Sequence, residues 1–134
     1  MSKKIKGLIS IFLSLIVLAS LATTAFAVEP RYSDTNKLTV ILSIDGTTAT
    51  CTASLIGADG TTSISNGHLI LKDSHGTTIG DWGNLSSNTD KLFVSKTVKN
   101  LTKGETYTLS FSANVNRNGK SEPVSGSSSK TCPK

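Results

Sequence analysis

Hydrophobic and polar residues alternate along most of the chain after residue 37. The alternation is clearest in residues 106–116, where every second residue is hydrophobic: Tyr107, Leu109, Phe111, Ala113 and Val115. Residues 38–44, 49–55, 63–72 and 92–98 follow the same two-residue period, and residues 122–132 end the series. A period of two places successive side chains on opposite faces of a strand, and no window of ten residues shows helical spacing. The pattern predicts an all-β chain.

Turn-forming pairs separate these segments. Asp45-Gly46 and Asn118-Gly119 are favoured hairpin turns, Asn66-Gly67 indicates a bend, and His75-Gly76 ends the third segment. Six or seven short strands in about 100 residues, with turn signals every 8 to 15 residues, are typical of a sandwich. We therefore predict an antiparallel Greek-key β-sandwich of about seven strands, with an immunoglobulin-like or fibronectin type III-like arrangement.

The first 27 residues have the layout of an export signal. Lys3, Lys4 and Lys6 precede an apolar stretch over residues 8–22, and Ala25-Phe26-Ala27 forms a small-x-small cleavage site. We expect cleavage after Ala27 and secretion of the mature chain, with an uncleaved N-terminal anchor as the alternative. The domain plan is then a signal peptide (1–27), a short extension (28–35) and the sandwich (36–134).

The charge balance argues against a nucleic-acid partner. The signal holds three lysines and no acidic residue, so the net charge of +5 for 134 residues falls to +2 for residues 28–134. No basic stripe with aromatic platforms remains, which such a partner would require. We also expect no membrane span in the mature chain, because no apolar segment of sufficient length follows the signal.

The two cysteines, Cys51 and Cys132, both belong to the exported part. Oxidising surroundings permit disulfides, and a small domain gains stability from a covalent cross-link. We therefore predict one disulfide between the two cysteines. The alternative, a free nucleophilic thiol, needs an adjacent base, and the sequence has no Cys-His motif.

The run from Leu101 through Gly104 to Tyr107 resembles the tyrosine corner of Greek-key sandwiches. The resemblance implies a buried Tyr107 whose hydroxyl bonds to the backbone just upstream. With the hairpin that follows at residues 118–125, the final 35 residues or so resemble fibronectin type III domains. The whole chain also resembles a family of small exported proteins of Clostridia-type, Gram-positive bacteria, and that resemblance implies the fold and no activity.

No set of residues predicts catalysis or a cofactor. His68 and His75 lie seven positions apart and are not expected to share a metal ion. The aspartates show no EF-hand spacing, and the chain has no Gly-x-Ser-x-Gly elbow. We therefore predict a protein that is not an enzyme and holds neither metal nor cofactor.

Trp82, between Gly80 and Asn84, allows two interpretations. It either fills the core or forms a sugar- or peptide-stacking platform on a glycine-flanked loop, with Tyr32 as a second ring. The leading hypothesis is a secreted, non-catalytic interaction or structural module that meets a ligand outside the cell or in the cell envelope. The alternatives are a carbohydrate- or peptide-binding protein that uses Trp82, and a small secreted inhibitor or toxin with a protruding loop at residues 81–90.

Overall fold

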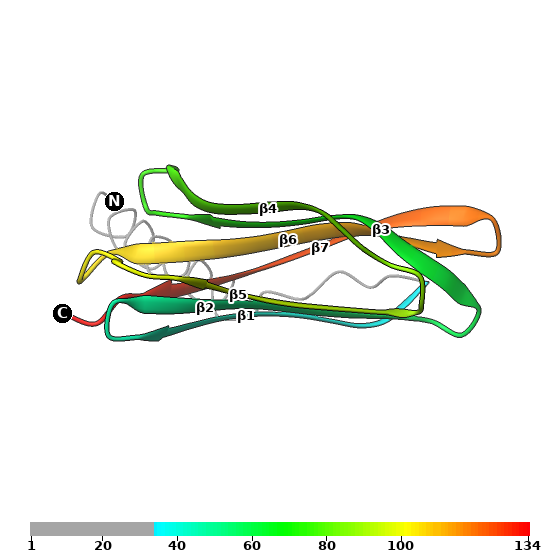
Figure 1. Cartoon of the computed structure of the whole chain (residues 1–134), viewed down its shortest axis with the longest axis horizontal. Helices are drawn as coiled ribbons and strands as arrows, with labels where there is room; N and C mark the ends of the chain where they lie inside the picture. Colours follow the sequence, from blue (N-terminus) through cyan, green and yellow to red (C-terminus); the bar gives the residue numbers. More distant parts are fainter. Residues whose placement is uncertain (1–33) are drawn as a thin grey trace, which may run out of the picture. The chain divides into compact units, whose positions relative to one another are not determined.

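Seven β-strands make up the part of the chain that the computed structural model describes, residues 34–134 (Figure 1). Their bounds are β1 Thr35–Asp45, β2 Thr48–Gly57, β3 Thr61–Lys72, β4 Thr78–Ser87, β5 Lys91–Val98, β6 Thr106–Arg117 and β7 Lys120–Thr131. The expected export signal, the first part of the extension and Tyr32 lie outside the described residues.

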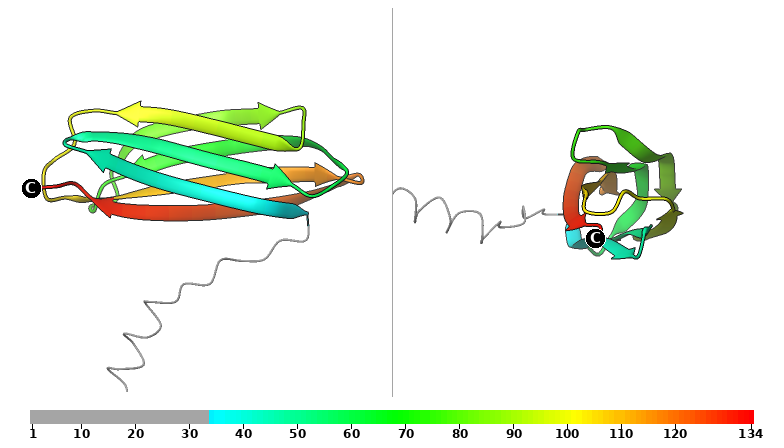
Figure 2. Two further views of the ribbon diagram at one scale, coloured as in Figure 1. Left: turned by 90° about the horizontal axis from the view of Figure 1, so that it is seen from below. Right: turned by 90° about the vertical axis from the view of Figure 1, so that its left-hand side faces the viewer.

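The strands form two antiparallel sheets packed face to face, which confirms the predicted sandwich (Figure 2). One sheet has the order β1-β2-β5 and the other the order β4-β3-β6-β7. In constant-type immunoglobulin domains the fourth strand joins the sheet of the first, second and fifth strands. Here β4 pairs with β3 instead, so the sheet that contains β6 gains a fourth strand.

Alternating residues of both sheets build the core between them. The inward positions of β2 and β6 are buried along almost their whole length, as the two-residue period predicts. Leu55, Leu69, Leu109 and Val115 are completely buried, and no polar or charged side chain is buried within residues 34–134. The packing between the inner faces of the two sheets is therefore hydrophobic.

One side of the sandwich is closed by a close approach of two edge strands. β1 lies beside β7, and a Cβ atom added at Gly126 of β7 would come within 3.2 Å of Val40 and 3.3 Å of Leu38, both on β1. A side chain at Gly126 would therefore require the Val40 and Leu38 side chains to shift. The serine-rich end of the chain thus forms β7, an edge strand of the four-stranded sheet.

Two turns show how local sequence sets the strand register. Asn118 and Gly119 both have positive φ, 53° and 73°, and connect β6 to β7 as a two-residue hairpin loop. The predicted loop of the first hairpin, Asp45-Gly46, is displaced by one residue in the structure. Asp45 pairs with Thr48, so the two loop residues are Gly46 and Thr47. Glycine takes φ +60° at the first loop position, where a side chain would be strained.

β4 is the strand that the hydrophobic pattern does not predict. Asn84 adopts φ 54° within it, and the pairing with β3 shifts between Leu85 and Trp82. The two hydrophobic residues that face the core are consequently three positions apart instead of two. Most of the loop expected at residues 81–90 is therefore strand, and only residues 88–90 connect β4 to β5.

The connections gather at the two ends of the sandwich. We call one end the corner end; it consists of turns 46–47, 73–77 and 99–105 and of residues 132–134. We call the other the Arg117 end; it consists of Asp34 and of turns 58–60, 88–90 and 118–119.

Candidate functional site

The tyrosine corner organises the corner end. Tyr107 is buried, and its hydroxyl oxygen accepts a hydrogen bond from the Thr102 N–H at 2.8 Å. Leu101 is buried as well, and its N–H donates to the carbonyl of Thr47 at 2.9 Å. Gly104 completes the turn with φ +82°. The three residues of the motif thus make the contacts that a tyrosine corner requires, and they fix the loop before β6 against the first hairpin.

The predicted disulfide is absent: Cys51 and Cys132 are both buried free thiols. The Cys132 thiol instead contacts the carbonyl oxygen of Gly46 at 3.2 Å, in the turn before β2, whereas Cys51 lies within β2 opposite Leu42. Burial raises the pKa of the Cys51 thiol to about 11. Because the thiolate is the nucleophilic form, Cys51 is a poor candidate for catalysis near neutral pH.

The backbone of Cys132 also ties the chain end to the corner. Its N–H donates to the carbonyl of Glu105 at 2.8 Å, and its carbonyl accepts from Gly104 at 2.9 Å. The loop before β6 is therefore held both by Tyr107 and by the segment that follows β7.

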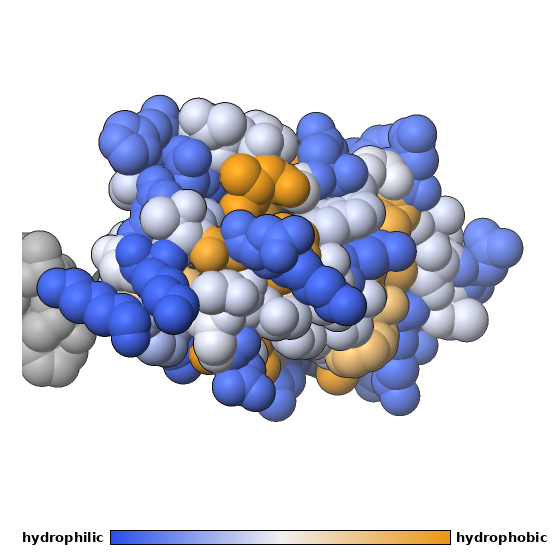
Figure 3. Space-filling view, turned by 60° about the vertical axis from the view of Figure 1, so that its left-hand side comes forward, coloured by the Kyte–Doolittle hydropathy of each residue, from blue (hydrophilic) through white to orange (hydrophobic). Residues whose placement is uncertain are grey.

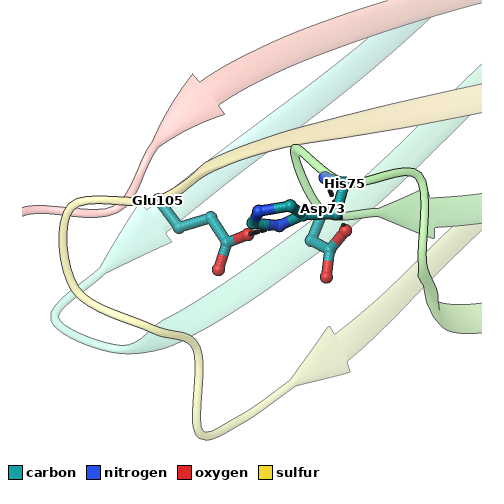
Figure 4. A group of neighbouring side chains, drawn as sticks. All are labelled: Asp73, His75 and Glu105. Atoms are coloured by element: carbon teal, nitrogen blue, oxygen red, sulfur yellow. Dashed lines mark hydrogen bonds and ion pairs between the residues drawn. The ribbon is translucent and has the colours of Figure 1, made fainter.

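A cluster of three potential metal ligands lies on this fixed loop and on the neighbouring β3–β4 turn. Asp73, His75 and Glu105 each place one ligand atom within 4.8 Å of the others (Figure 4). Asp73 Oδ1 accepts hydrogen bonds from the N–H groups of His75 and Thr77, both at 2.9 Å. Glu105 Oε1 accepts one from the Ser74 hydroxyl at 2.9 Å and lies 3.2 Å from His75 Nδ1. We call these three residues the Asp73 cluster.

The surroundings of the Asp73 cluster are polar. The Glu105 side chain is only 15% exposed, whereas the His75 ring is 82% exposed, so the cluster opens to solvent on the histidine side. A view towards this end of the molecule shows mainly hydrophilic and neutral residues with small hydrophobic areas between them (Figure 3). A charged or polar ligand can therefore reach this end of the molecule without displacing a large hydrophobic surface.

The second histidine pairs separately, on the outer face of the four-stranded sheet. His68 Nε2 lies 2.5 Å from Asp81 Oδ1, and both side chains are substantially exposed. Ser112 is the cross-strand neighbour of His68 on β6, yet no hydrogen bond joins the two side chains within the described structure. The three residue types of a hydrolase triad are thus close together without the contact that would activate the serine.

Trp82 lies within β4 and not on a loop, which corrects the position expected for a platform. Its side chain packs against the core cluster and is only partly exposed. The six-membered part of its ring lies over Gly80, where a Cβ atom would come within 2.5 Å of it. Gly80 therefore makes room for the ring, and Trp82 covers the edge of the core.

The large exposed hydrophobic residues lie elsewhere. In residues 34–134 they are Phe93, Ile41 and Ile79, with exposures of 69%, 50% and 36%. Phe93 and Ile41 share the outer face of the three-stranded sheet, where they flank Ser54 and Thr52 of the central strand β2. We call these four residues the Phe93 face. The alternation of Leu92, Phe93 and Val94 already predicts that Phe93 points outward.

Comparisons with known proteins leave the family open: no protein-family model and no curated protein matches the chain. Within residues 34–134 there is no helix long and apolar enough to cross a membrane.

Proposed function

We propose that this protein is a secreted, non-catalytic interaction module that binds a component of the cell envelope or its surroundings through the Phe93 face. The observation that carries the proposal is the 69% exposure of Phe93 in the interior of a regular strand. An aromatic ring on a rigid sheet offers a large contact area with little conformational entropy to lose on binding. The hydroxyl groups of Thr52 and Ser54 beside it supply polar contacts.

The β6–β7 half of the other outer face supports this choice of surface. The outward residues of β6 and β7 are almost entirely small and polar, with cross-strand hydroxyl pairs such as Thr106–Thr131 at 2.7 Å and Thr108–Ser129 at 2.8 Å. Such pairs satisfy one another and present no hydrophobic anchor. Interfaces usually take their affinity from a few buried aromatic or aliphatic anchors, which favours the Phe93 face.

The alternatives have less support. A carbohydrate- or peptide-binding platform at Trp82 would need the ring to be free, and it packs on Gly80 and the core. An inhibitor loop at residues 81–90 would need a protruding segment, and residues 81–87 belong to the strand β4. A hydrolytic activity would need a hydrogen-bonded nucleophile and base, which the His68–Asp81 pair does not provide.

The experiment compares binding by three matched variants. We would measure co-sedimentation of the purified protein with purified cell walls, and its binding to arrays of extracellular proteins and glycans. Phe93→Ser and Ile41→Ser are expected to weaken binding at least about tenfold, whereas Ile79→Ser, an exposed isoleucine outside the face, serves as the control. Unchanged circular dichroism and melting temperature would show that each variant is folded. Full binding by Phe93→Ser, or an equal loss in the control, would contradict the proposal.

A further inference from the structure

We propose that the Asp73 cluster binds a divalent transition-metal cation, with Zn²⁺ as the representative ion. The donor set consists of one imidazole nitrogen and two carboxylate oxygens. This combination suits zinc, which accepts nitrogen and oxygen ligands and often keeps one position for solvent. Calcium takes six to eight oxygen ligands and is a poorer match for a site that includes histidine.

In each of the two carboxylates, the described part of the protein donates hydrogen bonds to one oxygen and not to the other. Asp73 Oδ1 is engaged by two backbone N–H groups, and Glu105 Oε1 by Ser74 and His75. Among the described residues, nothing donates a hydrogen bond to the second oxygen of either group. In metal sites, hydrogen bonds from neighbouring residues orient each carboxylate ligand and leave its other lone pairs available to the metal ion. The contacts of Asp73 and Glu105 are of this kind.

Within the described structure, the two carboxylates of the cluster are not paired with a lysine or an arginine. Among residues 34–134, the ion-pair partner of Glu105 is His75, and Asp73 has none. Two carboxylates at this separation repel each other, and a divalent cation would remove that repulsion. Lys72 and Lys103 are close to the cluster in the sequence, but among the described residues neither forms an ion pair with Asp73 or Glu105, so the two carboxylates can attract a cation.

The geometry needs only a small adjustment. Metal–ligand bonds of about 2.0 to 2.2 Å place two ligands of one zinc ion about 3 to 4 Å apart. The ligand atoms of the cluster all lie within 4.8 Å of one another, and His75 Nδ1 and Glu105 Oε1 are already 3.2 Å apart. The three atoms therefore need to approach one another by no more than about 1 Å.

The scaffold around the cluster is already ordered. The β3–β4 turn is closed by Asp73 N–H to Thr77 O at 3.0 Å and Gly76 N–H to Asp73 O at 3.1 Å. The carbonyl of Glu105 is held by Cys132, as described above. Binding would therefore order few additional groups, and this preorganisation favours affinity.

The test is calorimetric titration of the chelator-treated protein with ZnCl₂ and, separately, with CaCl₂. We expect one Zn²⁺ per chain, a higher melting temperature in Zn²⁺, and weaker or undetectable binding of Ca²⁺. Asp73→Asn, His75→Ala and Glu105→Gln should each lower Zn²⁺ affinity at least about tenfold. The asparagine keeps an oxygen that can accept the two N–H bonds of the turn, so that variant should fold normally.

His68→Ala is the matched control, because it removes the other histidine–carboxylate pair of the same hairpin. It should leave Zn²⁺ affinity unchanged. Zn²⁺-induced shifts of the His75 ring signals in NMR spectra would locate the ion independently of any affinity. Absence of saturable binding, Ca²⁺ binding as tight as that of Zn²⁺, or a loss in His68→Ala with none in His75→Ala would each overturn the proposal.

Discussion

The two ends of the sandwich hold their acidic groups in different ways. At the Arg117 end, the Arg117 guanidinium bonds to the Asp34 carboxylate at 2.9 Å and to the carbonyl of Asp59 at 2.7 Å. At the corner end, Asp73 and Glu105 are held by backbone N–H groups, a serine and one exposed histidine. Asp34 is thus paired with an arginine at one end, whereas at the other no lysine or arginine in residues 34–134 forms an ion pair with Asp73 or Glu105. The difference singles out the Asp73 cluster as the place where a bound cation would add an interaction that the described residues do not provide.

The largest effect is expected from Leu101→Ala at the corner end. Leu101 is 6% exposed, and removing its side chain should lower the free energy of unfolding by about 2 to 5 kcal/mol through lost burial and the resulting cavity. Urea denaturation measures the change. Ile79→Ala, at an exposed position, should stay within about 0.5 kcal/mol of the natural protein; equal effects of the two substitutions would show that Leu101 is no anchor.

Alkaline pH should destabilise the protein through Cys51. The thiol has an ordinary pKa of 9.0 and a native pKa of about 11, so between these values the unfolded state has lost a proton that the native state retains. Stability that is fully present below pH 9 should therefore fall as pH rises towards 11, by about 1.4 kcal/mol for each unit of the pKa difference. Thermal melts of the natural protein and of Cys51→Ala measure this; the same pH slope in both would refute the assignment.

Tyr107→Phe tests the corner through one hydrogen bond. The substitution removes the acceptor for the Thr102 N–H and keeps the ring, so stability should fall by about 1 to 3 kcal/mol. Hydrogen exchange of the Thr102 amide should accelerate more than exchange in β3. An unchanged unfolding midpoint would indicate that the loop before β6 does not depend on this contact.

Arg117→Gln should have the smallest effect. The guanidinium is 30% exposed and Asp34 16% exposed, so the pair is screened by solvent and should contribute about 1 kcal/mol or less. The loss should shrink further in high salt. A loss as large as that of Leu101→Ala, insensitive to salt, would remove the contrast between the two ends.

Much of the fold is predictable because burial follows a simple period. Residues 106–116 alternate so regularly that β6 and its inward residues follow directly, and the Leu101-to-Tyr107 spacing places a hydroxyl beside the backbone it contacts. β4 is missed for a physical reason: the left-handed backbone at Asn84 breaks the two-residue period, and Gly80 and Gly83 suggest a loop. The alternation of hydrophobic and polar residues therefore predicts which side chains are buried only where the backbone forms a regular strand.

The candidate sites depend on contacts that no local spacing reveals. Asp73 and Glu105 lie far apart in the sequence, and the pairing of β3 with β6 brings them together. The disulfide prediction is wrong although both cysteines are buried: the structure holds them as free thiols, and the Cys132 thiol contacts the carbonyl oxygen of Gly46 instead. Phe93, by contrast, could have been recognised, since the residues on both sides of it point inward.

The lateral contact between β1 and β7 has a mechanical consequence. Both strands run from the Arg117 end to the corner end, so Asp34 and Cys132 lie at opposite ends of the sandwich (Figure 2). A pulling force between these two residues would act along the strands and therefore across their hydrogen bonds, which run perpendicular to the strands. The ladder between β6 and β7 is continuous from Thr106–Thr131 to Arg117–Lys120, so its bonds would share the load in shear instead of opening one after another.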